Sequence, residues 1–209
     1  MDSTSAANLA AAGLTAIAAA FAGLAAARSS QASRTLSRIE QHRRHEELTP
    51  QFSVTLQSGS GKAAASPTLR VTLIGPLGLG GGLDRCTVRV RDDRLRAPSG
   101  LADGPTAADI AGQVWGPFRF TPGSEGADAV GRCVGPVPVA LDELRLFQME
   151  RSTTPAWYAD PGAWEKQYPP LAPVRLAFHC EAAGQPPWDV LVEVRTGKAT
   201  SASTSAATA

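Results

Sequence analysis

The chain has 209 residues, which suits one ordinary domain with tails or two small domains. Its 20 basic and 19 acidic side chains nearly cancel, and a net charge of +1 argues against a protein that binds nucleic acid through bulk positive charge. An apolar content of 43% excludes a fully disordered chain, and three cysteines cannot form a closed disulfide framework.

The N-terminal segment is rich in alanine and has one charged side chain, Asp2, in its first 27 residues. Residues 6–27 carry no charge, and a helix of that length spans roughly 30 Å, the thickness of a bilayer core. The sequence therefore predicts an apolar, alanine-rich helix over residues 1–27 that anchors the protein in a membrane through residues 6–27.

Two alternatives remain open for this segment. Small residues at Ala25-Ala26-Ala27 suit a signal-peptide cleavage site, which would yield a secreted β domain, although the basic start of a signal peptide is missing. A soluble, self-associating helix is the other alternative, because four apolar side chains follow one helix seam at 3-4-3 spacing. A homo-oligomer would form through Leu14, Ile17, Phe21 and Leu24, and the same seam could pack two membrane anchors together.

Basic residues follow the apolar segment, and none precedes it. The positive-inside rule then predicts a single-pass plasma-membrane protein whose C-terminal domain is cytoplasmic. Residues 28–49 contain no Gly or Pro and predict a basic, polar connector helix that ends before Pro50. Its arginines either contact anionic lipid or point into solvent. They are Arg28, Arg34, Arg38, Arg43 and Arg44.

From Gln51 onward the apolar residues recur with a period of two, as in antiparallel strands with one buried face. The alternation predicts strands over 52–57, 69–73, 86–91, 174–181 and 188–195, with shorter strands over 114–120 and 144–149. We therefore expect a mainly β protein, in which a long N-terminal helix precedes an antiparallel β-sandwich, immunoglobulin-like or similar, over residues 50–195. The Ser/Thr/Ala-rich tail, residues 196–209, is expected to be disordered.

The phase of the alternation places Cys86 and Cys180 on the apolar faces of their strands, as small core residues. An odd number of cysteines at buried positions fits a reducing cytoplasm. A Cys86–Cys180 bridge across the sheets is the alternative if the membrane topology is reversed. Cys133 lies in a less regular segment.

Four large aromatic residues occur within 12 positions of a proline-rich stretch. They are Trp157, Tyr158, Trp164 and Tyr168. Trp and Tyr are favoured at binding hot spots, so the stretch is a candidate interaction surface. The alternative is a long loop that these aromatic residues hold against the core.

Signatures of catalysis are missing from the sequence. It has no G-x-S-x-G and no H-E-x-x-H motif, and alternation places His179 and Cys180 on opposite faces. The glycines of Gly75–Gly82 match neither a Rossmann fingerprint nor a P-loop. Carboxylates at Asp92, Asp93, Glu125 and Asp128 lack the spacing of a calcium loop. We therefore expect no enzyme, no cofactor, no metal site and no nucleic-acid partner.

Several stretches resemble a group of uncharacterised proteins from high-GC actinobacteria. These are the runs His45–Phe52 and Gln113–Phe120, the Pro-Gly-x-x-Gly-Ala-Asp pattern at Pro122–Asp128, Pro173–Leu176 and Pro187-Trp188. An excess of 17 arginines over 3 lysines also fits a high-GC genome. The resemblance implies a family with an N-terminal apolar helix and a β-rich domain, and it implies no activity or site.

Together these patterns predict a non-enzymatic, membrane-anchored protein that presents a cytoplasmic β-sandwich for protein or ligand binding. The soluble self-associating protein and the secreted β domain are the alternatives.

Overall fold

The computed structural model describes residues 31, 33–57, 66–92, 104–158, 160–169, 171–195 and 200–202. The chain divides into two compact units, Met1–Glu47 and Leu48–Ala209. Each unit is described by itself below.

In the first unit, residues 33–47 are helical, within the segment predicted as the connector. The helix exposes its arginines, and Arg43 Nε lies 3.0 Å from Glu47 Oε1, an i,i+4 pair on the helix surface. No helix in the described part of the chain is long and apolar enough to cross a membrane. The predicted anchor over residues 1–27, its seam from Leu14 to Leu24 and Arg28 lie outside the described residues.

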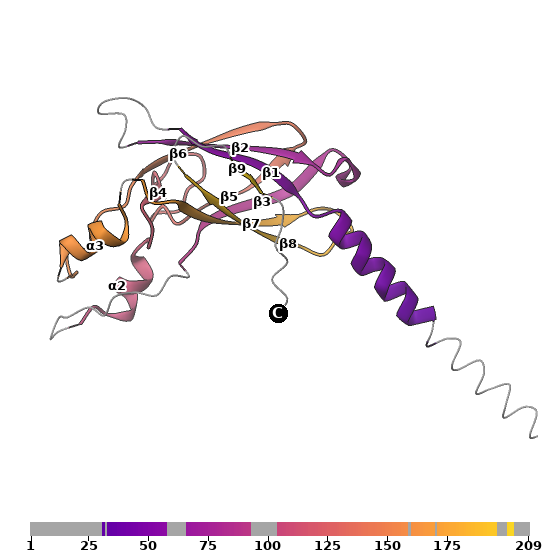
Figure 1. Cartoon of the computed structure of the whole chain (residues 1–209), viewed down its shortest axis with the longest axis horizontal. Coiled ribbons are helices and arrows are strands. Elements are labelled where there is room, and N and C mark those ends of the chain that lie inside the picture. Colours follow the sequence, from indigo (N-terminus) through magenta and orange to yellow (C-terminus); the bar gives the residue numbers. More distant parts are fainter. Residues whose placement is uncertain are drawn as a thin grey trace, which may run out of the picture. The chain divides into compact units, whose positions relative to one another are not determined.

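The second unit is built from two antiparallel sheets, which confirms the prediction of a mainly β, antiparallel domain (Figure 1). Among the described residues, one sheet has the strand order β4-β6-β2-β1-β9 and the other β5-β3-β7-β8. The strands are β1 (Gln51–Gln57), β2 (Thr68–Gly75), β3 (Gly82–Val90), β4 (Phe118–Phe120), β5 (Cys133–Ala140), β6 (Leu144–Arg151), β7 (Val174–Glu181), β8 (Trp188–Val194) and β9 (Thr200–Ala202). The helices are η2 (Leu77–Leu79), α2 (Ala107–Gly112) and α3 (Pro161–Gln167).

Buried and exposed side chains alternate along the strands, as the sequence predicts. In β8 the four buried residues are Trp188, Val190, Val192 and Val194.

The predicted strand over 114–120 is wrong in length, because only Phe118–Phe120 pairs with β6. Pro117 has no amide hydrogen for a ladder, and the residues before it pack elsewhere. Thr200–Ala202, within the tail predicted to be disordered, pairs with β1 as β9.

The buried faces of the two sheets contribute to one hydrophobic core. Phe52 of β1 and Phe178 of β7 are fully buried, and their rings stack with centroids 4.6 Å apart. This pair joins the sheets directly, because β1 and β7 belong to different sheets.

The edge strand β5 was not predicted from the sequence, because Gly135, Pro136 and Pro138 interrupt its alternation. Both prolines lack an amide hydrogen, which restricts them to edge positions in a sheet. Neighbouring groups occupy the outward-facing backbone of this strand. The Arg145 guanidinium donates to Pro138 O at 2.9 Å, and the Glu143 carboxylate accepts from Ala140 N at 2.9 Å.

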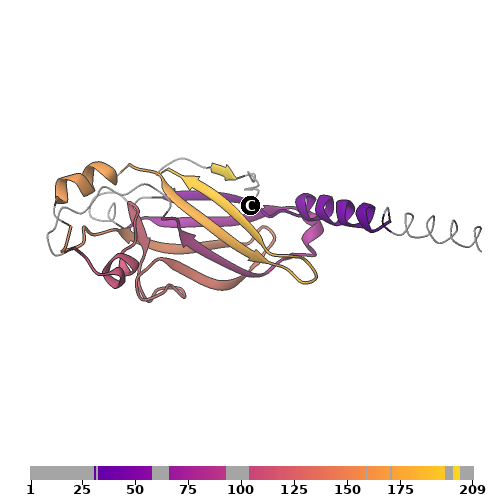
Figure 2. The same ribbon diagram turned by 90° about the horizontal axis from the view of Figure 1, so that it is seen from below.

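The helices α2 and α3 lie at the same end of the β domain in two perpendicular views (Figures 1 and 2). α2 begins with a capping box, in which Asp109 N donates to Thr106 Oγ1 and Thr106 N donates to the Asp109 carboxylate. α3 begins with Pro161 at its first position, where the missing amide hydrogen costs no helix bond. This end carries the predicted interaction residues.

Candidate functional site

The α2–α3 end holds an aromatic cluster that is separate from the main core. We define the aromatic cluster as Trp115, Tyr158, Trp164 and Tyr168, all buried, with Trp157 packed against them. Trp164 lies on α3, and Tyr168 is the residue that caps the C-terminal end of this helix, where its amide donates to Trp164 O. Their ring centroids are 4.7 Å apart, and Trp164 also lies 5.6 Å from Tyr158 and 5.7 Å from Trp115.

The structure therefore brings together all four residues of the predicted interaction surface, but it buries three of them. Tyr158, Trp164 and Tyr168 are 7%, 3% and 3% exposed. Trp157 is half-buried, and its ring lies 5.9 Å from Trp115 and 6.2 Å from Tyr158. The interaction surface stays a prediction, and Trp157 is the one residue of the four that is partly exposed.

Sequence reasoning missed Trp115 as a member of this cluster. Trp115 precedes β4 and contacts the other rings across more than 40 residues of chain. Its indole Nε1 donates to Ile110 O of α2 at 3.3 Å, which fixes the ring against that helix. The available signal was its Gly-Pro neighbour, since Gly116-Pro117 ends the strand pattern and frees Trp115 to pack toward the helices.

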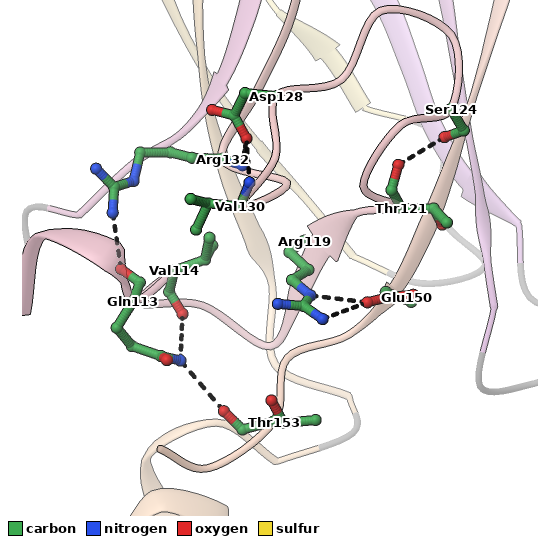
Figure 3. Close-up of polar contacts among 10 residues, drawn as sticks. All are labelled: Gln113, Val114, Arg119, Thr121, Ser124, Asp128, Val130, Arg132, Glu150 and Thr153. Atoms are coloured by element: carbon green, nitrogen blue, oxygen red, sulfur yellow. Dashed lines mark hydrogen bonds and ion pairs between the residues drawn. The ribbon is translucent and has the colours of Figure 1, made fainter. Parts of the chain in front are cut away.

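Polar contacts join the loops on either side of β4 and after β6 (Figure 3). The Arg132 guanidinium donates to Gln113 O at 3.0 Å and to Ala111 O, two carbonyls at the C-terminal end of α2. Gln113 Nε2 donates in turn to Val114 O and to Thr153 O, both at 3.2 Å. Cationic groups suit a helix C-terminus, where carbonyls lack partners within the helix.

An ion pair joins strands β4 and β6 at the same end of the domain. Arg119 of β4 and Glu150 of β6 form an ion pair with Nη2 2.6 Å from Oε1 (Figure 3). Arg151 of β6 donates to Tyr168 O at 3.2 Å, which ties the end of α3 to the sheet. Arginine side chains thus bond to backbone oxygens of Tyr168 and of Gln113, which lies two residues before Trp115.

Asp128 organises the loop between β4 and β5. Its carboxylate accepts from the backbone amides of Val130 (3.1 Å), Arg132 (2.8 Å) and Cys133 (3.2 Å), and from the Cys133 thiol (3.1 Å). Gly131 in this turn has a φ of 77°, and a Cβ there would collide with Phe120 O. These bonds use both oxygens of Asp128 for the loop itself, so Asp128 acts as a structural residue here.

These contacts set the protonation of both groups in the loop. Partial burial alone would raise the pKa of Asp128, but the hydrogen bonds from the Cys133 thiol and the backbone amides outweigh it and lower that pKa. Burial, followed by the neighbouring Asp128 carboxylate, raises the pKa of the Cys133 thiol. Cys133 therefore stays protonated and weakly nucleophilic.

The lowered pKa of Asp128 predicts a pH-dependent contribution to stability. A carboxylate with a folded-state pKa below its unfolded value of about 3.9 stabilises the fold above that value, and the contribution is lost as the pH falls through the folded-state pKa. Asp128→Asn places an NH₂ group against the Cys133 donors, and we expect it to lower the free energy of unfolding by about 1–2 kcal/mol at neutral pH.

Urea unfolding from about pH 7 down to about pH 2 checks this expectation, with Glu165→Gln on the exposed face of α3 as the control. The difference between wild type and Asp128→Asn should shrink as the pH falls below the usual carboxyl range. A difference that is constant across the whole pH series would contradict a role for the ionised carboxylate.

A small pocket lies between the sheet and the aromatic cluster. Its walls are Val90, Arg91, Trp115, Gly116, Pro117, Tyr168, Pro173 and Arg175. Its volume of about 10 Å³ is enough for a single water molecule. Pockets for cofactors or drug-sized ligands measure roughly 300–1,000 Å³, so this one does not suit such a ligand.

A wider hollow of about 430 Å³ lies at the turn between β7 and β8. The two carboxylates in its wall already have partners within the protein. Asp84 accepts from Ala183 N at 2.7 Å, and Glu181 pairs with Arg85 at 3.5 Å. No aromatic side chain lines this hollow, so the α2–α3 end is the stronger candidate.

Comparison with known proteins finds no matching protein-family model, no matching curated protein and no matching solved structure. The resemblance to actinobacterial proteins therefore stays a prediction.

Proposed function

We propose that the protein is a non-enzymatic binding protein that uses the α2–α3 end of its β domain to recognise a protein partner. The partly exposed ring of Trp157, packed against a buried aromatic cluster, carries this proposal. A tryptophan whose position is fixed before binding loses little conformational freedom on binding, and such residues dominate interface energies.

Further apolar surface supports a protein partner over a small molecule. Leu171, in the same connection between β6 and β7 as Trp157, is 78% exposed. The pocket beside the aromatic cluster has room for one water molecule, whereas a partly exposed tryptophan and an exposed leucine suit the partly apolar surface of another protein.

The fold proposal is an immunoglobulin-like β-sandwich, and the strand order supports it. The sheet order β1-β2-β6 corresponds to strands A-B-E of that fold, and β5-β3-β7-β8 corresponds to C′-C-F-G. The shared core and the stacked Phe52–Phe178 pair are what a sandwich requires between its two layers. The short strand β4 is an insertion between C and C′ in this correspondence.

The membrane part of the proposal is supported by the sequence. The uncharged residues 6–27 would anchor the protein in the plasma membrane as a single span, and the five arginines that follow would keep the β domain on the cytoplasmic side. Arg34, Arg38, Arg43 and Arg44 are exposed on their helix, where anionic lipid could contact them, although Arg43 also pairs with Glu47.

Photo-cross-linking in cells tests the proposal. A photoreactive phenylalanine analogue replaces Trp157 in the full chain, and a matched variant carries it at Leu191, 39% exposed on the outer face of β8. We expect a discrete adduct from position 157, recovered in the membrane fraction, and no such adduct from position 191.

The outcomes separate the parts of the proposal. Equal labelling from the two positions would reject the α2–α3 end as a binding surface. Recovery of the full chain in the soluble fraction would reject the anchor. An adduct of twice the chain's mass would favour the self-associating alternative, and a mature N-terminus at Arg28 or Ser29 would favour the secreted one.

A further inference from the structure

Two buried thiols face each other across neighbouring strands of the β5-β3-β7-β8 sheet. Cys86 of β3 pairs with Cys180 of β7, and the two side chains are 1% and 0% exposed. They belong to the same sheet, so the arrangement differs from a bridge across the two sheets. The third cysteine, Cys133, donates its thiol to Asp128 and lies on β5.

The register shows which kind of cross-strand pair the two cysteines form. Arg91 N donates to Arg175 O at 2.8 Å, which makes these residues a hydrogen-bonded pair of the β3–β7 ladder. The two kinds of pair alternate along an antiparallel ladder, and the register from Val90 back to Arg85 has no shift. Cys86 and Cys180 lie five positions from Arg91 and Arg175, so they form a non-hydrogen-bonded pair.

This kind of pair has the geometry that a disulfide needs. Opposite Cα atoms in a non-hydrogen-bonded pair are about 4.5 Å apart, and disulfides span Cα distances of roughly 4.4–6.8 Å. Both side chains point to the same buried face of the sheet. A bond between the sulfur atoms therefore requires side-chain rotation and no change in strand pairing.

The surroundings of the pair control how readily it reacts. A hydrogen bond with Cys86, followed by burial, raises the pKa of the Cys180 thiol. The thiolate is the reactive form, so thiols in the folded domain exchange slowly. Reaction requires an opened or still unfolded domain, in which both thiols reach water.

We propose that Cys86 and Cys180 are a covalent modification site, which a small disulfide such as oxidised glutathione converts into an intramolecular cross-strand disulfide. The thiolate of one cysteine attacks oxidised glutathione, forming a mixed disulfide and releasing one reduced glutathione. The second cysteine then displaces the bound glutathione and closes the Sγ–Sγ bond. The protein gives up two electrons and two protons, which two reduced glutathione molecules carry away.

The redox state of the Cys86–Cys180 pair therefore depends on the compartment in which the domain folds. In an oxidising compartment the bond closes before burial, whereas in a reducing compartment the folded domain retains the dithiol. The bond closes a loop of about 95 residues, so it restricts the unfolded chain strongly. The inference does not rest on the proposed binding function.

Oxidative refolding of the full chain tests the proposal. The reduced, denatured protein is refolded in a mixture of oxidised and reduced glutathione, and peptides are mapped by mass spectrometry without reduction. We expect a Cys86–Cys180 linked peptide, an intact mass lower by two hydrogens, and a thermal midpoint about 5 °C or more above that of the dithiol form. Trp188 lies opposite Cys180, and its fluorescence should fall on bond formation.

Controls keep the test decisive. Cys133→Ser should leave the linked peptide and the mass change intact, whereas Cys86→Ala or Cys180→Ala should abolish both. Folded wild type treated with the same mixture should react at least about tenfold more slowly than the refolding chain, and urea below the unfolding midpoint should speed the reaction. Free thiols at both positions after oxidative refolding, or a bridge that includes Cys133, would overturn the proposal even where an alanine variant fails to fold.

Discussion

Replacement of Phe178 by alanine is expected to lower the free energy of unfolding by about 3–5 kcal/mol. Phe178 is fully buried in β7 and stacks on Phe52 of the other sheet, with an angle of 25° between the rings. The substitution removes the ring and leaves a cavity where the two sheets meet, and neither sheet can close it without disturbing its own ladder. Since domains are stable by only about 5–15 kcal/mol, this is a large share of the total.

Urea unfolding followed by tryptophan fluorescence measures this effect, as a fall of about 1.5–2.5 M in the midpoint. Leu191→Ala on the outer face of β8 is the matched control, and we expect it to cost less than about 1 kcal/mol. Phe178→Leu, which keeps more of the buried volume, should fall between the two. An equal loss in Phe178→Ala and Leu191→Ala would contradict a core shared by both sheets.

Replacement of Trp164 by alanine is expected to cost a similar amount, about 3–5 kcal/mol, but to act on the α2–α3 end. Trp164 is 3% exposed and contacts the rings of Trp115, Tyr158 and Tyr168. Aromatic pairs contribute about 0.5–1.5 kcal/mol each beyond the burial of their area, and this substitution removes three. The helix α3 has seven residues and does not persist without this packing.

Trp157→Ala is the informative comparison for Trp164. Trp157 is half-buried at the margin of the cluster, and we expect its removal to cost less than about 1.5 kcal/mol while it weakens partner binding. Hydrogen exchange should show faster opening of residues 161–168 in Trp164→Ala and near-normal protection in Trp157→Ala. Equal destabilisation by both substitutions would show that Trp157 is a packing residue like the others.

The sequence predicts most of the strands because alternation reports local burial directly. β7 spans Val174–Glu181, the same residues that the apolar period marks, and β8 differs from its predicted bounds by one residue. β5 was not predicted because two prolines and a glycine interrupt its alternation. Side chains from the following turn (Glu143) and from β6 (Arg145) bond to its backbone instead. A period of two in the sequence cannot reveal a strand like β5, whose outer backbone groups bond to side chains of later residues.

The sequence predicts which residues form the candidate site, but not which of them are buried and which face solvent. Four aromatic residues in 12 positions mark the α2–α3 end, yet which of them faces solvent depends on Trp115, which lies 42 residues before Trp157 in the sequence. The same limit applies to Cys86 and Cys180. Alternation places each on a buried face, but their opposition depends on the β3–β7 register, which no single strand encodes.

The covered edge of β5 has a consequence for how this protein can associate. Gly126 and Asp128 bond to the backbone of Gly135 and Cys133 along one half of that edge, and Glu143 and Arg145 occupy the other half. An additional strand could not form a regular ladder with this edge, because its prolines have no amide hydrogen and other backbone groups along it already have hydrogen-bond partners. This side of the domain therefore resists fibril-like growth by strand addition, and a complex that forms there must be made by side chains.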